Sequence, residues 1–223
     1  MDKYQENIIP AEGQNSENVY IYGEGSFRVL FVGNSITKHR PRPEIGWNND
    51  CGMAASKPEN DYVHILMRKI REEYCSDASY AIATAADFER GFDSKSLADD
   101  IKMRYSLAKA YNPHIIIMFF GANVPKDYDS AENPSVKFGD AYELFRNYLV
   151  GEHSSIFHSE GFYVRPKLDK EKKAVAKKYN DSFISLENIR NRDDTHGKYN
   201  HPGDIGMEEI ATAFWRAIKP TLK

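Results

Sequence analysis

Cysteine is scarce: the 223 residues include two, Cys51 and Cys75. Two thiols form neither a disulfide framework nor a set of four zinc ligands, so we expect both to be free rather than paired. The histidines lack a metal-binding spacing such as His-Glu-x-x-His. No Walker or Gly-x-Gly-x-x-Gly pattern follows the first apolar run, which argues against a nucleotide binder. The sequence therefore predicts no metal ion and no other cofactor.

Long apolar segments and an excess of one charge are also missing. The longest apolar run, residues 115–120, is far shorter than the roughly 20 residues that cross a bilayer. The first residues, Met-Asp-Lys-Tyr-Gln-Glu-Asn, show no secretory signal, although a leader already removed would leave the same sequence. Lys and Arg number 30 against 33 Asp and Glu. We therefore expect a cytoplasmic protein with neither nucleic acid nor a membrane as partner, in an oligomeric state that the sequence leaves open.

The composition that is present, 41% hydrophobic and 28% charged, is that of one globular domain. Residues 1–26 are polar and without a period, so we expect an N-terminal arm followed by a single domain over 27–223. Short apolar runs then alternate with segments of helical period. This alternation predicts a three-layer α/β/α fold, a flavodoxin-like doubly wound parallel sheet of about five strands. The expected strands cover 29–32, 79–84, 115–120, 155–163 and 183–186, and the expected helices cover about 62–74, 96–111, 136–150, 168–179 and 204–218.

Three segments lie where open α/β sheets bind their ligands, beyond the carboxyl ends of the strands or just before a helix. They are Gly33-Asn34-Ser35-Ile36-Thr37, Gly121-Ala122-Asn123 and His201-Pro202-Gly203-Asp204. Taken singly, each has an ordinary interpretation as a helix cap, a turn or a solvated loop, and we expect Asp204 to cap the last helix. Taken together, a serine, an amide and a histidine supply a nucleophile, an oxyanion donor and a general base.

In this order the three segments resemble the blocks of the SGNH (GDSL-like) hydrolases, a family that acts on esters and acylated sugars. The resemblance spans about residues 28–218. It implies that Ser35 is the nucleophile, that His201 is the base and that the Asn123 side chain helps to bind the oxyanion. It also implies hydrolysis of a small-molecule ester, with a small acyl group such as acetyl leaving a carbohydrate or another small molecule.

The chain departs from the family pattern just before the base. The family has an aspartate three residues ahead of its histidine, and here that position holds Lys198, which cannot accept the imidazole N–H. A backbone carbonyl or a distant carboxylate then orients His201. Alternatively the base is His196, which has Asp193 three residues before it. We expect His201, because the residues that follow it match the family block.

A second departure follows the second predicted strand. The family places there a glycine whose N–H binds the oxyanion, and this chain has Ala85-Ala86-Asp87 instead. Because the donor is a backbone group, we expect Ala86 to supply it, with Gly52 as a weaker substitute. The alternative is that the chain has lost its activity and is a catalytically impaired module of this fold that binds a carbohydrate-type ligand. The lysine at position 198, Lys198, favours this interpretation.

The loop over residues 38–60 is longer than the fold requires, and long loops in compact domains are usually functional or disordered. Its Trp47, together with Phe88, has two interpretations. The two aromatic rings line a sugar or acyl pocket, or they pack against the domain as ordinary core residues.

Overall fold

The centre of the molecule is a mostly parallel sheet. The structure is a computed structural model that describes residues 18–132 and 134–222. Within these residues six strands form one sheet in the order β1-β3-β2-β4-β5-β6, in which only β1 runs antiparallel to its neighbour. The strands are β1 (Val19–Tyr22), β2 (Arg28–Gly33), β3 (Ser79–Thr84), β4 (Ile115–Phe119), β5 (Ser155–Ser159) and β6 (Ser182–Ile184).

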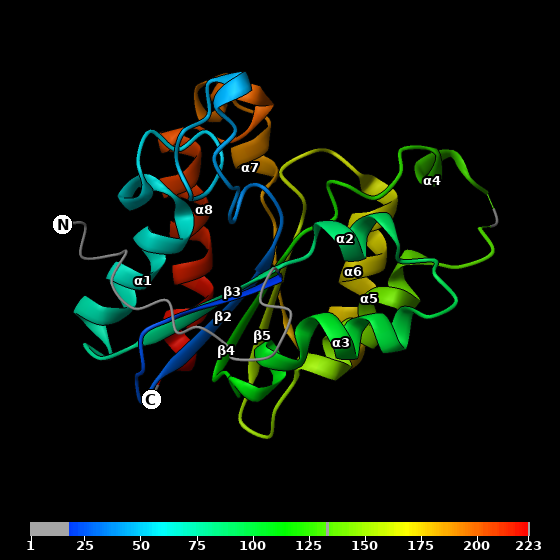
Figure 1. The fold of residues 1–223 in the computed structure, drawn as a ribbon, viewed down its shortest axis with the longest axis horizontal. Helices are drawn as coiled ribbons and strands as arrows, with labels where there is room; N and C mark the ends of the chain where they lie inside the picture. The colour runs from blue at the N-terminus through cyan, green and yellow to red at the C-terminus, as the bar shows by residue number, and fades with distance from the viewer. Residues whose placement is uncertain (1–17, 133, 223) are drawn as a thin grey trace.

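Helices cover both faces of this sheet, which confirms the predicted three-layer α/β/α fold. Figure 1 shows α1 (Tyr62–Glu73) and α8 (Asp204–Ile218) together on one face, with α7 (Glu187–Arg190) above them. The other face carries α3 (Leu97–Ala110), α5 (Phe138–Leu149) and α6 (Pro166–Tyr179). Two short helices, α2 (Ala86–Arg90) and α4 (Asp127–Ser130), lie on this second side and had no predicted counterpart.

The central strands separate two hydrophobic cores. Successive side chains of a strand point to opposite faces, so Val29 and Phe31 of β2 belong to the core under α1 and α8. Leu30 and Val32 belong to the core under α3, α5 and α6. All five residues of β4 are buried, as expected for a strand covered on both faces. Continuous apolar runs such as 115–119 therefore mark the middle of the sheet.

The sheet has one strand more than expected because β1 lies within the predicted arm. The Val-Tyr-Ile-Tyr segment of β1 pairs antiparallel with β3, from Val19 opposite Ala83 to Tyr22 opposite Tyr80. β-Branched and aromatic residues favour a strand, but four residues between polar flanks give a weak signal. Residues 1–17 of the arm lie outside the described part of the chain.

The long loop over 38–60 is ordered by short turns. It contains two single-turn 3-10 helices, Pro43–Ile45 and Pro58–Asn60, and isolated strand-like bridges from His39 to Cys51 and from Arg42 to Trp47. The loop ends at Asp61, whose carboxylate accepts the backbone N–H of His64 at 2.8 Å and caps α1 as predicted.

Asp204 does not cap α8, contrary to the prediction. The capping position is Gly203, and Asp204 is the first residue of the helix. Its carboxylate instead accepts the backbone N–H of Ser56 at 2.8 Å, the Ser56 hydroxyl at 2.6 Å and the Asn60 amide at 2.9 Å. The acid therefore ties the loop over 38–60 to the start of the last helix, a contact across the fold that the local sequence does not encode.

Two further expectations concern thiols and membranes. Cys51 is buried, Cys75 is half-buried, and both are free thiols. Among the helices of the described residues, none combines the length and the apolar character needed to span a bilayer.

Candidate active site at the carboxyl edge of the sheet

Ser35 lies in a tight turn directly after β2. The backbone N–H groups of Thr37 and Lys38 both donate to the carbonyl of Asn34, at 2.9 and 3.0 Å, and this closes the turn. A Cβ atom at Gly33 would lie 1.7 Å from the Thr37 hydroxyl oxygen, so the turn requires glycine there. The half-buried Ser35 is thereby presented at the carboxyl edge of the sheet.

His201 reaches this serine from the loop that precedes α8. Its Nε2 lies 2.7 Å from the Ser35 hydroxyl oxygen, although the two residues are 166 positions apart. On the other side of the ring, Nδ1 lies 2.8 Å from the backbone carbonyl of Tyr199 and 3.2 Å from the Tyr163 hydroxyl. Since a carbonyl only accepts, Nδ1 carries the proton and donates to Tyr199. Nε2 is then the acceptor for the serine proton.

The surroundings of His201 keep its ring neutral. Burial is the main cause that lowers the pKa of His201 below its ordinary value of 6.5; the bond to the Tyr199 carbonyl opposes this shift, and nearby His39 adds to it. Burial also raises the pKa of Tyr163 to about 12, so its phenol stays protonated. No carboxylate among the described residues hydrogen-bonds to His201, whose orientation therefore depends on neutral groups.

His196, the alternative base, lies elsewhere. Its Nε2 donates to the carbonyl of Arg190 at 3.0 Å, and its ring packs against Phe162 with centroids 4.7 Å apart. Lys198, which stands at the family's aspartate position, is exposed. The geometry thus brings His201 rather than His196 to the serine, and it provides a backbone carbonyl in place of the missing acid.

Asn123 follows β4 and lies at the same edge of the sheet. In the register of the parallel strands, Phe119 of β4 is opposite Gly33 of β2, so the segments after both strands emerge side by side. One N–H of the half-buried Asn123 amide donates to the Glu89 carboxylate. The second N–H of this amide makes no bond to another described residue, which leaves it available to another acceptor.

Glu89 of α2 connects the strand ends, and the sequence analysis missed it. Its carboxylate is completely buried and accepts the Asn34 amide at 2.9 Å, the backbone N–H of Gly121 and the Asn123 amide. A buried carboxylate is costly unless several donors satisfy it, and three do so here. The only sequence signal is its place five residues after the second predicted strand, within an ordinary charged stretch.

The two candidate backbone donors for the oxyanion, the N–H groups of Ala86 and Gly52, differ in whether they already have a partner. Thr84 of β3 is opposite Gly33, so Ala86, two residues later, emerges beside Ser35 at the sheet edge. Ala86 is the first residue of α2, where helix geometry leaves the backbone N–H without an intrahelical partner. The N–H of Gly52, in contrast, donates to the Asp61 carboxylate at 2.9 Å and is already occupied. Ala86 therefore remains the candidate donor and Gly52 does not.

Comparison with known proteins identifies the fold. No protein-family model matches the sequence, and no curated protein does. The structure resembles a family two carbohydrate esterase from Clostridium thermocellum, solved in complex with cellohexaose (TM-score 0.61, 16% identity, 90% of this chain and 66% of that one). It also resembles the M. smegmatis aryl esterase (TM-score 0.56, 12% identity, 89% of this chain and 100% of that one). A third similar structure is a putative lipolytic protein of the G-D-S-L family from Desulfitobacterium hafniense (TM-score 0.50, 17% identity, 86% of this chain and 99% of that one). The chain has the fold of the SGNH (GDSL-like) hydrolases. The fold that the resemblance of three short segments implied is thereby confirmed.

The two aromatic residues with open interpretations, Trp47 and Phe88, are both buried. Phe88 is 4% exposed and lies among Phe120 and Phe145 in the core under α3 and α5, so of its two interpretations the structure supports packing. Trp47 is equally buried, donates its Nε1–H to the His39 carbonyl at 3.2 Å, and meets the ring of Tyr199 edge to face. Trp47 also borders a cavity of about 620 Å³ between the loop over 38–60 and the loop before α8.

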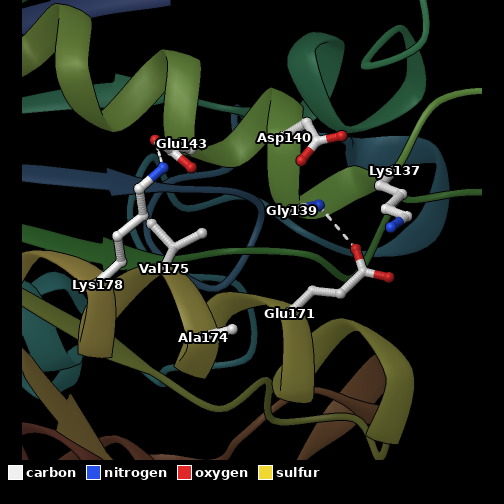
Figure 2. Close-up of a pocket in the computed structure, with 8 residues that line it drawn as sticks. All are labelled: Lys137, Gly139, Asp140, Glu143, Glu171, Ala174, Val175 and Lys178. Atoms are coloured by element: carbon white, nitrogen blue, oxygen red, sulfur yellow. Dashed lines mark hydrogen bonds and ion pairs between the residues drawn. The ribbon is translucent and has the colours of Figure 1, made fainter.

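A second cavity lies between α5 and α6. Figure 2 shows its lining, in which Lys178 pairs with Glu143 at 2.6 Å and Glu171 accepts the N–H of Gly139 at 2.7 Å. The cavity measures about 220 Å³. Two of its charged side chains, Lys178 and Glu143, are thus paired with each other. In the described part of the chain, no group of three or more His, Cys, Asp or Glu side chains is arranged to hold a metal ion.

Proposed function

We propose that this protein is a serine ester hydrolase that acts through an acyl-enzyme on Ser35. The observation that carries the proposal is the 2.7 Å contact between the Ser35 hydroxyl and His201 Nε2 at the ligand-binding edge of the sheet. A serine hydroxyl becomes an effective nucleophile when an adjacent, correctly oriented base accepts its proton. The known esterases that share this fold support ester hydrolysis as the general activity.

In the first half of the proposed reaction, the Ser35 oxygen attacks the ester carbonyl carbon while His201 Nε2 takes its proton. The imidazolium that forms is held by the Tyr199 carbonyl at Nδ1. His201 then returns the proton to the departing alcohol as the ester C–O bond breaks. In the second half, His201 takes a proton from a water molecule whose oxygen attacks the acyl carbon. It then returns this proton to the Ser35 oxygen as the acyl–serine bond breaks and the acid leaves.

The negative charge that develops on the carbonyl oxygen requires preorganised donors. We propose three: the backbone N–H groups of Ser35 and Ala86 and the second amide N–H of Asn123. All three follow the carboxyl ends of adjacent strands, in the register set by Gly33. The carboxylate of Glu89 holds the side chain of Asn123 through the other N–H of the amide.

For the substrate we propose a small acyl group, acetyl in the first place, carried by a carbohydrate or another small alcohol. The carbohydrate esterase with the same fold supports this choice. The experiment is a measurement of p-nitrophenol release from p-nitrophenyl acetate, followed by a screen of acetylated sugars against aryl esters with acetate release as the readout. Ser35→Ala is the matched control, and activity that survives in this variant contradicts the proposal.

The second candidate function is a binding module that has lost its activity. It is favoured by the lack of a carboxylate at His201 Nδ1 among residues 18–132 and 134–222; the family pattern has an aspartate three residues before the histidine, and this chain has the exposed Lys198 there. The same assay separates the two. An intact protein that binds acetylated sugars but releases neither p-nitrophenol nor acetate is a binding module, and turnover that depends on Ser35 excludes this interpretation.

A further inference from the structure

The residue that holds the candidate base has an unusual backbone conformation. Tyr199 has φ 59° and ψ 22°, and Asn200 after it has φ 56°. Both therefore lie in the left-handed region, which asparagine tolerates but which is uncommon for a bulky residue such as tyrosine. This is the conformation in which the Tyr199 carbonyl lies 2.8 Å from Nδ1 of His201. Residues held in such a conformation cluster at functional sites, where the surrounding structure has to enforce it.

The side chain of Tyr199 is anchored to a distant segment. Its hydroxyl donates to the carbonyl of Ile45 at 2.9 Å, across 154 positions of sequence. Its ring meets Trp47 edge to face, with centroids 6.5 Å apart. Trp47 is itself fixed, because its ring is buried, its Nε1–H donates to His39 and its backbone pairs with Arg42. The loop over 38–60 thus holds Tyr199 in place from one side.

We propose that Tyr199 is a positioning residue for His201: its anchored side chain keeps the left-handed backbone that aims its carbonyl at Nδ1, in place of the missing aspartate. The inference rests on the proposed function only in that His201 is the base. The loop over 38–60, which the sequence analysis considered as a pocket wall, thereby acts on the reaction through the orientation of the imidazole. A hydrogen bond from Nδ1–H to a fixed carbonyl selects the tautomer whose Nε2 accepts the serine proton.

Two substitutions separate positioning from packing. Tyr199→Ala removes the anchor and leaves a residue that disfavours the left-handed backbone. Tyr199→Gly removes the same anchor, but glycine adopts that backbone without strain. If the side chain only fills space, the glycine variant should lose as much function as the alanine variant. If the side chain enforces the left-handed backbone, the glycine variant should recover part of the function that the alanine variant loses, although glycine is the more flexible residue.

The experiment measures the imidazole ¹⁵N chemical shifts of His201 in the full chain, together with kcat and KM for p-nitrophenyl acetate. We expect Tyr199→Ala to show a mixture of tautomers and a kcat lowered about tenfold at unchanged KM, less than the 10²–10⁴ that a general base supplies. We expect Tyr199→Gly to keep the Nδ1–H tautomer and a kcat within about threefold of the parent. Tyr148→Phe, which removes a hydroxyl bond to the Lys102 carbonyl on remote helices, is the control and should change neither readout.

The proposal is overturned if glycine is as damaging as alanine, or if Tyr199→Ala retains the parent tautomer and kcat. Should the alanine variant fail to fold, Tyr199→Phe decides: it keeps the ring against Trp47 and removes the bond to Ile45, so a second tautomer should appear, and a parent-like spectrum contradicts us. If the parent protein hydrolyses no ester, the proposed function fails while the ¹⁵N comparison still tests Tyr199.

Discussion

Replacing Glu89 by glutamine exchanges one carboxylate oxygen for an NH₂ group in a fully buried site. One oxygen of Glu89 accepts both the Asn34 amide and the Gly121 N–H, and the other accepts the Asn123 amide. The glutamine keeps the larger number of bonds when its oxygen takes the first position. Its NH₂ group then faces the NH₂ group of Asn123, and two donors cannot bond to each other.

The expected losses in stability and in kcat follow from these contacts. Hydrogen bonds to a charged group contribute about 1.5–3 kcal/mol each, so losing one and weakening two should lower the free energy of unfolding by about 2–4 kcal/mol. Displacement of Asn123 removes one oxyanion donor, which lowers kcat about 10²–10³-fold with little change in KM. Urea unfolding and p-nitrophenyl acetate kinetics on the same preparation measure both effects.

A matched control separates the two effects. Glu171→Gln makes the same change at a carboxylate that accepts the N–H of Gly139 and the hydroxyl of Tyr128, away from Ser35. It should lower the free energy of unfolding and leave kcat unchanged. In the double variant with Asn123→Ala, the losses in kcat should not add, because both changes remove the same donor. A kcat for Glu89→Gln equal to that of the control, or fully additive losses, would refute the role given to this carboxylate.

Four further predictions concern the reacting groups themselves. Ser35→Ala should lower kcat by several powers of ten with the thermal unfolding curve intact, because it removes the nucleophile; near-parental turnover would contradict the mechanism. Asn123→Ala should lower kcat about 10²–10³-fold at unchanged KM, and an unchanged kcat would make it a turn residue. His201→Ala should nearly abolish turnover, whereas His196→Ala and Lys198→Ala should leave most of it, since neither side chain contacts Ser35; the reverse order would make His196 the base. Because burial lowers the pKa of His201, its ring stays neutral to lower pH. The midpoint of the acid limb of the kcat/KM profile should therefore lie below pH 6.5. A limb at or above that value argues against this environment.

Much of the fold could be predicted because its signals are local. The buried runs at 29–32 and 115–120 and the helical period after Asp61 are readable within a few residues. Ser35 and His201 could be proposed from the sequence for the same reason, since each lies in a short segment of small residues beside a strand end or a helix start. β1 was missed because pairing with β3, rather than its own four residues, makes it a strand.

The supporting residues of the site could not be predicted, because their roles arise from contacts between distant segments. Glu89 lies in a charged stretch, and only the folded chain buries it among three donors. Tyr199 acts through a backbone carbonyl, a group that every residue has, and its left-handed conformation depends on Ile45 and Trp47. Tyr163 approaches His201 from 38 positions away. Short sequence patterns indicate candidate reacting groups more readily than the residues that orient them.

The two cores on either side of the sheet carry different parts of the candidate site. The loops around Ser35 and His201 rest on the core under α1 and α8, through Ile36, Trp47 and Met207. The segments with Ala86 and Asn123 rest on the core under α3 and α5, through neighbours such as Phe88 and Val124. A cavity opened in one core should therefore shift one half of the site against the other. The contact between serine and histidine would survive such a shift while the distance to the oxyanion donors changed. Variants of the second core thus give a way to vary oxyanion stabilisation without touching the nucleophile or its base.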